Sequence, residues 1–574
     1  MYLSNIKLWN FRKFGSENFV IENPNLNLNF TKGLNVIIGE NDSGKTAIID
    51  AIKLVLKTHS YEYIRVEKDD FYTGSDRFRI ELTFSDLSDD EAKNFTEWLS
   101  WEGEGDHIKP ILRVFYDVEK KDDKISPTDI KAGADNEGYT LTAEAREYLK
   151  TTYLKPLRDA ESELISKKNS RFSQILFGDP IFKNNITNHP LVSDFNSIND
   201  KIRDYFGSGE GNSVKGKIDN YIKGFYGQEK ETIFTVSNND LKSILEKLSL
   251  SLKDEKNVGL GTLNRLCMAA ELLHLNKNNW SGLRLGLIEE LEAHLHPQAQ
   301  MQIIETLQKQ ENIQLILTTH SPNLASKVKL ENLIICNNGN AFPMGRDYTK
   351  LAPNDYIFLE KFLDVTKSNL FFAKGVILVE GWAEEIIIPS LAKAIGIDLT
   401  EKGVSVVNIG SVAFDHYSKI FLRKFTPNMT IPVAVVTDCD VQEYESNGGD
   451  IVKRQNIEEE INNKINSIQN KSEENVKYFV APCWTLEYCM HLSDSLGEKF
   501  KEITKEIHSK TNWTDFEKGL AKKLLTGGDL NKTKIAYRVA NHLDSIPSIT
   551  ISNNDKLNYL EQAIKYASGN NNNE

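Results

Sequence analysis

The stretch LNVIIGENDSGKTAIIDAIKLVL at residues 34–56 predicts a nucleotide-binding α/β domain. A short apolar strand, LNVIIG, leads into a glycine-containing loop, and an apolar-periodic helix follows. In a phosphate-binding loop, backbone N–H groups curl around phosphate, a lysine reaches the β- and γ-oxygens, and a hydroxyl holds Mg²⁺. We therefore expect ATP and Mg²⁺ to be bound by this loop, through Gly39, Asn41, Gly44, Lys45 and Thr46.

A second group of residues is expected to complete the nucleotide site from much later in the chain. The apolar strand LRLGLI leads into Glu289 and Glu290. The first can hold Mg²⁺ through water, although most such ATPases have aspartate there, and the second can orient the attacking water. His320 follows the apolar strand QLIL and can contact the γ-phosphate. A solvated helix start is the alternative interpretation of the two glutamates.

The segment GLGTLNRL at residues 259–266 predicts a helix whose N-terminus can face an anion. In ABC-type ATPases such an element completes the nucleotide site of the opposite subunit. The sequence resembles the RecF/SMC branch of these ATPases, although the segment departs from the usual LSGGQ form. The resemblance implies that Gly261 and Asn264 serve the ATP of a neighbouring copy, in a homodimer or a larger even-numbered oligomer. A plain helix N-cap is the alternative.

Apolar strands in the last third of the chain end in acidic residues. GVILV precedes Glu380, with Glu384 one helical turn later, PVAVVT precedes Asp438 and Asp440, and CWTLEYCM contains Glu487. Functional groups gather at the carboxyl ends of parallel strands, so these acids are expected to converge. Clustered carboxylates repel one another, and a divalent cation is the usual reason to assemble them. Such ions could activate water for phosphodiester cleavage. Unrelated acids facing solvent are the alternative.

These residues resemble the TOPRIM domain, which has a glutamate after its first strand and a DxD after a later one. The whole chain is similar to the OLD (overcoming lysogenization defect) family, in which an ABC-type ATPase precedes a TOPRIM nuclease. The resemblance runs from NFRKFG at residues 10–15 to KTKIAYRVA at residues 532–540. It implies an ATP-regulated DNA endonuclease or nickase of bacterial antiphage defence, with Mg²⁺ or Mn²⁺ held by Glu380, Glu384, Asp438, Asp440 and Glu487.

The resemblance also singles out a lysine near the end of the chain. Lys532 matches the lysine of the family's late "KGxFA"-like element, which here reads KTKIA. The glycine and the phenylalanine are missing, so Lys534 is an alternative for the same role. A cation there could stabilise the charge that develops on a phosphorane. A plain surface lysine is the other interpretation.

The resemblances imply an α/β protein with a RecF/SMC-like ATPase domain followed by a Rossmann-like TOPRIM domain, and a change in composition predicts a helical insertion that splits the ATPase domain. The Lys/Asn/Ser-rich insertion is either a dimerisation region or a plain helical subdomain. The first residues, MYLSNIKLWNFRKF, alternate like an edge strand and lack the apolar core of a signal peptide. The expected segments are ATPase at 1–160 and 251–345, insertion at 161–250, linker at 346–370, TOPRIM at 371–565 and a disordered tail at 566–574.

Charge and cysteine content limit the remaining function classes. A net charge of −13 leaves room for a local basic groove that binds DNA. No apolar run approaches the roughly 18 residues of a membrane helix, which argues against a transporter motor and favours the cytoplasm. No zinc-ligand spacing supports a primase, and no tyrosine stands out for a topoisomerase. A RecF-like repair ATPase whose TOPRIM domain does not cleave is the second hypothesis. A helicase or a retron reverse transcriptase is the expected kind of partner.

Overall fold

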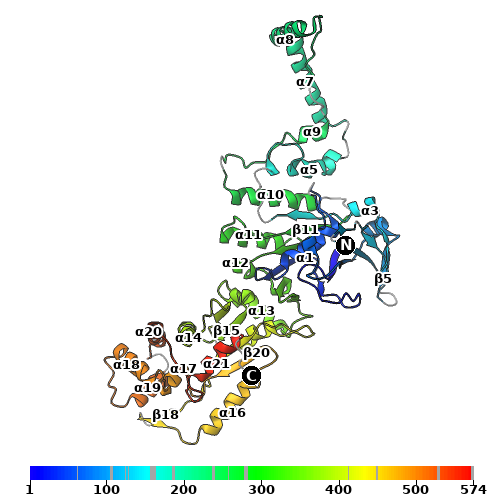
Figure 1. Ribbon diagram of the computed structural model, residues 1–574. Helices are drawn as coiled ribbons and strands as arrows, with labels where there is room; N and C mark the ends of the chain where they lie inside the picture. The colour runs from blue at the N-terminus through cyan, green and yellow to red at the C-terminus, as the bar shows by residue number, and fades with distance from the viewer. Residues whose placement is uncertain are drawn as a thin grey trace.

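The computed structural model describes residues 1–569 except 61–62, 104–107, 123, 127, 156–162, 184–185, 187, 236–239, 256–257, 277–281, 411–412, 448–449 and 527–529. Two sheets form an N-terminal lobe and a third sheet forms a C-terminal lobe below it in Figure 1. The order of strands and helices gives the α/β class that the sequence predicts.

The phosphate-binding loop follows the central strand of a six-stranded sheet. Strand β3 lies between β12 and β13 and is buried along its whole length. All neighbours in this sheet are parallel except the last pair, so the carboxyl ends of five strands meet at one edge. In spatial order the strands are β10 (Thr152–Leu154), β11 (Leu285–Ile288), β12 (Gln314–Thr318), β3 (Leu34–Gly39), β13 (Leu333–Asn337) and β14 (Asn340–Pro343).

Helix α1 (Lys45–Leu56) is packed between this sheet and an antiparallel one. The antiparallel sheet contains β2 (Leu26–Asn29), β1 (Tyr2–Trp9), β4 (Arg77–Ser85), β6 (Lys109–Lys121), β8 (Lys131–Ala132) and β9 (Tyr139–Thr140), with β5 (Leu99–Glu102) and β7 (Lys124–Ile125) on β6. The edge position expected for the first strand is wrong, because β1 pairs with both β2 and β4. Alternation reports one buried face and does not distinguish an edge strand from an inner one.

The described part of residues 161–250 contains helices and no strand, between the adjacent strands β10 and β11. Its helices are α5 (Arg171–Phe177), α6 (Pro180–Lys183), α7 (Pro190–Ser208), α8 (Gly211–Tyr226) and α9 (Leu241–Leu245), and α10 (Leu260–Leu275) follows. The α7–α8 hairpin extends away from the rest of the molecule in Figure 1. It exposes a set of large apolar side chains, Ile198, Ile202, Tyr205, Val214, Ile218, Tyr221 and Phe225. The sequence YLKPLRDA at residues 153–160 also predicts a strand that runs into a turn; β10 contains its first residues, and 156–160 lie outside the described residues.

The C-terminal lobe is built on a four-stranded parallel sheet in the order β16 (Val404–Asn408), β15 (Gly375–Val379), β17 (Val433–Thr437) and β20 (Val476–Val480). Helices cover it, chiefly α14 (Trp382–Ala394), α15 (Phe414–Ser418), α16 (Glu458–Gln469), α17 (Leu486–Leu492), α18 (Gly497–Ile507), α19 (Phe516–Leu525), α20 (Lys532–Ser545) and α21 (Asn558–Ala567). Helix α21 extends to Ala567 because its apolar periodicity continues to that residue. The expectation that the tail is disordered from residue 566 is therefore wrong for residues 566 and 567.

The two lobes share a hydrophobic core. Along β15, Val376 and Leu378 point into a cluster that also contains Leu34 and Leu315 of the N-terminal lobe. The alternate residues Ile377 and Val379 point into the cluster formed with α14, α20 and α21. The segment expected as a linker forms α13 (Pro353–Phe362) and most of η5 (Lys367–Phe372), and both pack into the shared core. No described helix has the length and apolar character needed to cross a membrane.

Candidate nucleotide and metal sites

The phosphate-binding loop holds its lysine over its own backbone. Lys45 Nζ donates to the carbonyl oxygens of Gly39 at 2.9 Å and Glu40 at 2.5 Å. Burial lowers the pKa of Lys45. Gly44 has a φ of 103°, and a Cβ there would come within 2.7 Å of the Phe14 ring, so only glycine fits. Phosphate oxygens can replace these carbonyls as partners of the ammonium group.

Two glutamates follow β11 at the same edge of the sheet, and they differ in burial. Glu289 is buried and accepts a hydrogen bond from the Tyr153 hydroxyl at 3.3 Å. Burial, and then the nearby Asp50, raises the pKa of Glu289 to about 7. Glu290 is exposed, with a left-handed φ of 44°, and its N–H donates to Thr318 Oγ1 at 3.2 Å. The exposed carboxylate is the one free to orient water, and the buried one retains a proton unless a cation is near.

His320 is oriented by a residue that the sequence did not single out. Glu292 accepts hydrogen bonds from the Thr319 hydroxyl at 2.7 Å and from the His320 N–H at 2.6 Å. Burial, and then the charge of Lys45, lowers the pKa of His320, whose ring is close to the Gly39 backbone. A neutral imidazole therefore lies beside the phosphate-binding lysine.

The N-terminus of α10 contacts the segment that follows β11, and among the described residues no hydrogen bond or ion pair joins it to the phosphate-binding loop. A Cβ on Gly261 would come within 2.8 Å of the His294 carbonyl oxygen. Asn264 is buried, and its Nδ2 donates to the Ala293 carbonyl at 3.4 Å, while its Oδ1 has no partner in the part of the chain that the structure describes. These contacts fix α10 against the segment after β11.

A cleft of about 520 Å³ opens beside the phosphate-binding loop. Its walls come from the loop, from the N-terminal segment and from the turn after β13. Arg12 ties the N-terminal segment to α1 through Asp50 at 2.7 Å and also pairs with Asp70 at 2.9 Å. Lys13 donates to the carbonyl of Asp42 within the loop.

Two strands of the C-terminal lobe begin at this cleft. Lys374, directly before β15, lies with its Nζ 3.7 Å from Glu40 Oε2 of the phosphate-binding loop. Thr430, three residues before β17, accepts a hydrogen bond from Asn338 Nδ2 at 2.8 Å and donates to Asn337 Oδ1 at 3.1 Å. The opposite ends of β15 and β17 carry the acidic residues, so each strand joins the two sites.

The acids of the C-terminal lobe gather around one lysine. Lys532 begins α20, and its Nζ lies 3.0 Å from Glu487 Oε2, which also accepts from the Thr485 hydroxyl at 2.9 Å. The Leu486 N–H donates to Asp438 Oδ1 at 2.8 Å. Glu380 Oε2 is buried and has no hydrogen-bond partner among the described residues. An unpartnered buried carboxylate oxygen is costly, and a cation would satisfy it.

The pKa values show how poorly these charges are balanced. Burial, then Asp440, raises the pKa of Glu380, and burial, then Glu487, raises that of Glu384 to about 7. Burial, again with Glu487, raises the pKa of Asp438 well above its usual range. Burial alone would lower the pKa of Lys532, but Glu487 and the other carboxylates outweigh burial and raise it. One lysine does not neutralise the group, which therefore takes up protons unless a cation replaces them.

The carboxylate oxygens of these acids are suitable ligands for a divalent cation, but the described side chains are not arranged at the distances that bind one. Carboxylate oxygens are the ligands that Mg²⁺ and Mn²⁺ prefer. Among the described residues, no three His, Cys, Asp or Glu side chains meet at the spacing of a single ion. Asp440 is exposed, with a left-handed φ of 58°, and its N–H donates to the Trp484 carbonyl at 3.0 Å. Lys534, the alternative lysine, is exposed and lacks the contact that Lys532 makes with Glu487.

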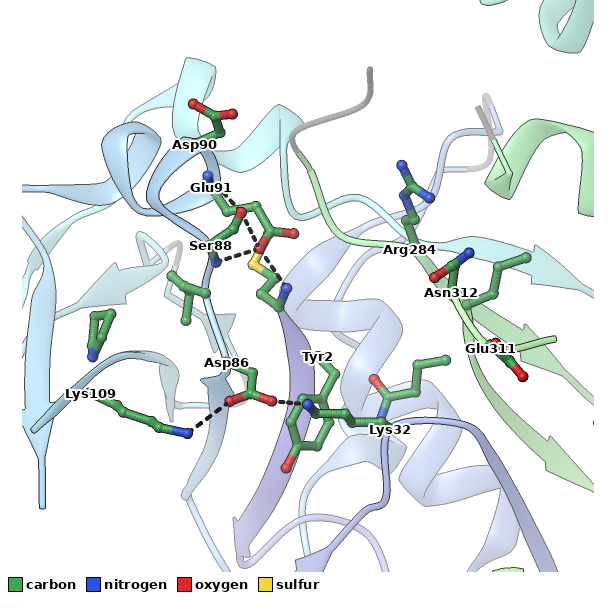
Figure 2. Close-up of a pocket in the computed structure, with 15 residues that line it drawn as sticks. Tyr2, Lys32, Asp86, Ser88, Asp90, Glu91, Lys109, Arg284, Glu311 and Asn312 are labelled. Carbon is green, nitrogen blue, oxygen red and sulfur yellow. Dashed lines mark hydrogen bonds and ion pairs between the residues drawn. The ribbon is translucent and has the colours of Figure 1, made fainter. Parts of the chain in front are cut away.

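A larger hollow of about 920 Å³ lies at the opposite, amino-terminal edge of the six-stranded sheet (Figure 2). Lys32 and Lys109 both pair with Asp86 there, and Glu91 accepts from Ser88 and from the Met1 amino group. Its charges are thus already matched by neighbours, unlike those of the C-terminal acids.

Comparisons with known proteins find family matches in both halves of the chain. The family described as "AAA domain, putative AbiEii toxin, Type IV TA system" matches residues 34–326, just over half of the chain. The family described as "Overcoming lysogenization defect protein-like, TOPRIM domain" matches residues 371–440. The Endonuclease GajA of Bacillus cereus (strain HuB5-5) is 23% identical over 547 residues, 77% of each chain. The OLD nuclease of Thermus scotoductus is 23% identical over 456 residues, covering 74% of this chain and 81% of its own.

A solved structure, the C-terminal region of the Xanthomonas campestris OLD protein, matches 35% of this chain and 95% of its own at 21% identity, with a TM-score of 0.23. The family matches confirm the order of an ATPase domain and a TOPRIM domain, and with it the use of a nucleotide and a divalent metal. The chain belongs to the OLD-type family, in which an AAA-type ATPase domain precedes a TOPRIM domain.

Proposed function

We propose that the protein is an ATP-regulated, divalent-metal-dependent DNA endonuclease or nickase of antiphage defence. The observation that carries the proposal is the buried, unpartnered oxygen of Glu380 within a group of carboxylates that one lysine does not neutralise. The names of two relatives, an endonuclease and an OLD nuclease, support the same activity.

In this proposal the acids hold Mg²⁺, with Mn²⁺ as an alternative, through Glu380, Glu384, Asp438, Asp440 and Glu487. A bound cation of this kind supplies a water of lowered pKa and withdraws charge from the phosphate. Lys532 contacts Glu487 of this group, so its ammonium can stabilise the negative charge that develops on the phosphoryl oxygens. Thr485 and the Leu486 N–H hold Glu487 and Asp438 in position.

Nucleotide control follows from the way the two lobes meet. ATP and Mg²⁺ would occupy Lys45, Thr46 and the carboxylates after β11, with Glu290 orienting water and His320 facing the γ-phosphate. The same loop contacts Lys374, and the turn beside the cleft contacts Thr430. A nucleotide that moves either contact shifts the start of β15 or β17, and therefore the acids at their far ends.

A second copy of the chain is part of the proposal. Gly261 at the start of α10 would serve the nucleotide of the neighbour, whereas Asn264 is buried and instead holds α10 in place. The exposed apolar side chains of the α7–α8 hairpin would form a dimer contact within the insertion at 161–250. We also propose the remaining domain boundaries. They are ATPase at 1–160 and 251–345, linker at 346–370 and TOPRIM at 371–565. DNA is the substrate, and a helicase or a reverse transcriptase of a retron is the proposed partner.

The test is nicking of supercoiled plasmid by the purified protein with Mg²⁺ or Mn²⁺, beside Glu380→Ala. Glu401→Ala, an exposed acid of the same lobe, is the control. We expect cleavage by the parent and the control and none by Glu380→Ala. A folded parent that binds plasmid and never cuts it would contradict the proposal and favour a repair-type ATPase.

A further inference from the structure

A tryptophan is displayed beside the carboxylate group. Trp382 begins α14, two residues after Glu380, and 66% of its surface is exposed. It takes part in no hydrogen bond, ring contact or cation–π contact with the described residues. A large indole left in water forgoes the free energy of burial, so its position next to the acids calls for a ligand that covers it.

Helices α19 and α20 form a basic segment of the chain, and Lys532 of this segment contacts the carboxylate group. From Lys518 to Leu543, along α19 and α20, the sequence has six cationic residues against one acidic residue, a net charge of +5 within a chain of −13. Lys532 pairs with Glu487 and Arg538 with Glu506. In the described part of the chain the remaining lysines of this segment, Lys518, Lys522, Lys523 and Lys534, form no ion pair. Unpaired cations are available to phosphate groups.

The helix starts that carry Trp382 and Lys532 both lie at the carboxylate group, since α14 and α20 pack side by side (Figure 1). Lys532 at the start of α20 acts on the pKa values of Glu380 and Glu384 at the start of α14. Tyr537 lies three residues after Lys534, on the same face of α20, and is 57% exposed. Trp382 therefore lies beside the acids. Lys534 and Tyr537 lie farther along α20, on the exposed face of the helix that Lys532 begins.

Exposed aromatic rings beside a basic surface are the arrangement that binds single-stranded nucleic acid, because every base offers a face for stacking. We propose that Trp382 stacks on an unpaired base next to the phosphate that is cut, while Lys534 and Tyr537 contact the strand beyond it. The substrate is then DNA that contains unpaired nucleotides, and Trp382 is a positioning residue. This inference rests on the proposed nuclease function, whose site it extends.

The test measures DNA binding in EDTA, where cleavage does not take place. A labelled single-stranded oligonucleotide and a fully paired duplex are titrated with the full-length protein and with Trp382→Ala, Trp382→Phe and Tyr537→Ala. Trp101→Ala is the matched control, because Trp101 on β5 is also 66% exposed and belongs to the other lobe. A stacked base predicts that Trp382→Ala weakens single-strand binding by about 5- to 150-fold. The loss should be smaller for Trp382→Phe and absent for Trp101→Ala.

Equal single-strand affinities of Trp382→Ala and Trp101→Ala would overturn the inference, as would an equal loss on duplex. A change in oligomer mass by light scattering, with DNA affinity kept, would identify the surface as a subunit contact and overturn it too. Plasmid cleavage by the parent is measured separately. Cleavage with no effect of Trp382→Ala defeats only this inference, whereas absent cleavage with weakened binding defeats only the nuclease function.

Discussion

The nucleotide site and the carboxylate site lie at the carboxyl edges of two parallel sheets, but they balance charge in different ways. In the first, Lys45 is held by backbone carbonyls and Glu290 faces solvent. In the second, Glu380 has a buried oxygen without a partner, and Lys532 is shared among several acids. The first site is stable as it stands, because its loop satisfies the lysine, whereas the second is incomplete without a cation.

This difference teaches where each site is sensitive. Backbone N–H groups bind phosphate in the nucleotide site, so single side-chain changes there should affect turnover more than binding. The carboxylate site relies on side chains alone, so removal of one should affect the cation and every step that needs it.

The largest expected effect is the loss of cleavage when acids are removed. Glu380→Ala, or Asp438→Ala with Asp440→Ala, should lower metal-dependent nicking by at least about 100-fold, the usual loss when one electrostatic partner of a transition state is removed. Nucleotide binding should be unchanged, and the melting temperature in EDTA should be equal or higher because like charges are removed. Plasmid nicking, a nucleotide-binding assay and a thermal melt check this. Folded variants that cut as fast as the parent would refute the metal-site assignment.

Changes in the nucleotide site should separate binding from hydrolysis. Lys45→Ala should abolish ATP hydrolysis, since no other cation in the loop can reach the β- and γ-phosphates. Glu290→Gln should bind ATP and hydrolyse it about 100- to 10,000-fold more slowly, the range for loss of a general base. Phosphate release and equilibrium binding of labelled ATP give the two quantities. Normal turnover by Glu290→Gln would show that another group orients the water.

A smaller effect is expected at the contact between the sites. Lys374→Glu replaces attraction to Glu40 with repulsion, and so should reduce the effect of ATP on the nicking rate. Lys374 is 62% exposed, so the change should not exceed about fivefold. The double variant Lys374→Glu with Glu40→Lys restores the opposite charges and should recover the response. An unchanged ATP response in the single variant would exclude this contact as a path between the sites.

The smallest effect concerns stability, at a carboxylate whose partners are complete. Glu517 accepts hydrogen bonds from Tyr444 and Tyr488 at 2.7 Å and from Lys453 at 2.9 Å. Burial would raise the pKa of Glu517, but these donors outweigh it and lower the pKa from its usual 4.5 to about 2. Glu517→Gln should cost about 1 to 3 kcal/mol of the free energy of unfolding at neutral pH.

The sign of the pH dependence follows from the lowered pKa. The native state binds fewer protons than the unfolded chain between pH 4.5 and about 2, so the stabilisation by Glu517 is present above that window and is lost as the pH falls through it. Urea denaturation of the parent and Glu517→Gln across this range measures it. A difference between the two proteins that grows on acidification would contradict the assignment.

The sequence was sufficient wherever a function depends on neighbouring residues. The strand, loop and helix around Lys45 were predicted from one continuous stretch, as were the strands that end at Glu380 and Asp438. The α/β class and the order of the two domains followed from the same motifs. Their placement needs only local patterning and the rule that parallel strands end at one edge.

Residues whose role depends on packing between distant segments could not be predicted. The resemblance favoured Lys532 but left Lys534 open, and only the packing of α20 against α14 shows that Lys532 is the one that reaches Glu487. Glu292 was missed because its partners, Thr319 and His320, are supplied by a separate strand. No residue pattern announces a hydrogen bond between side chain and backbone across such a distance.

The position of β3 in its sheet has a consequence for the synthesis of the chain. Both neighbours of this strand, β12 and β13, are encoded after the helical insertion. A nascent chain that has left the ribosome as far as the insertion therefore carries a largely apolar strand with two open edges, which invites aggregation. The phosphate-binding loop acquires its supporting sheet only once β13 has emerged. Chains that terminate early should be retained by chaperones and should fail to bind nucleotide. Nucleotide binding would therefore distinguish chains with a complete N-terminal sheet from truncated ones.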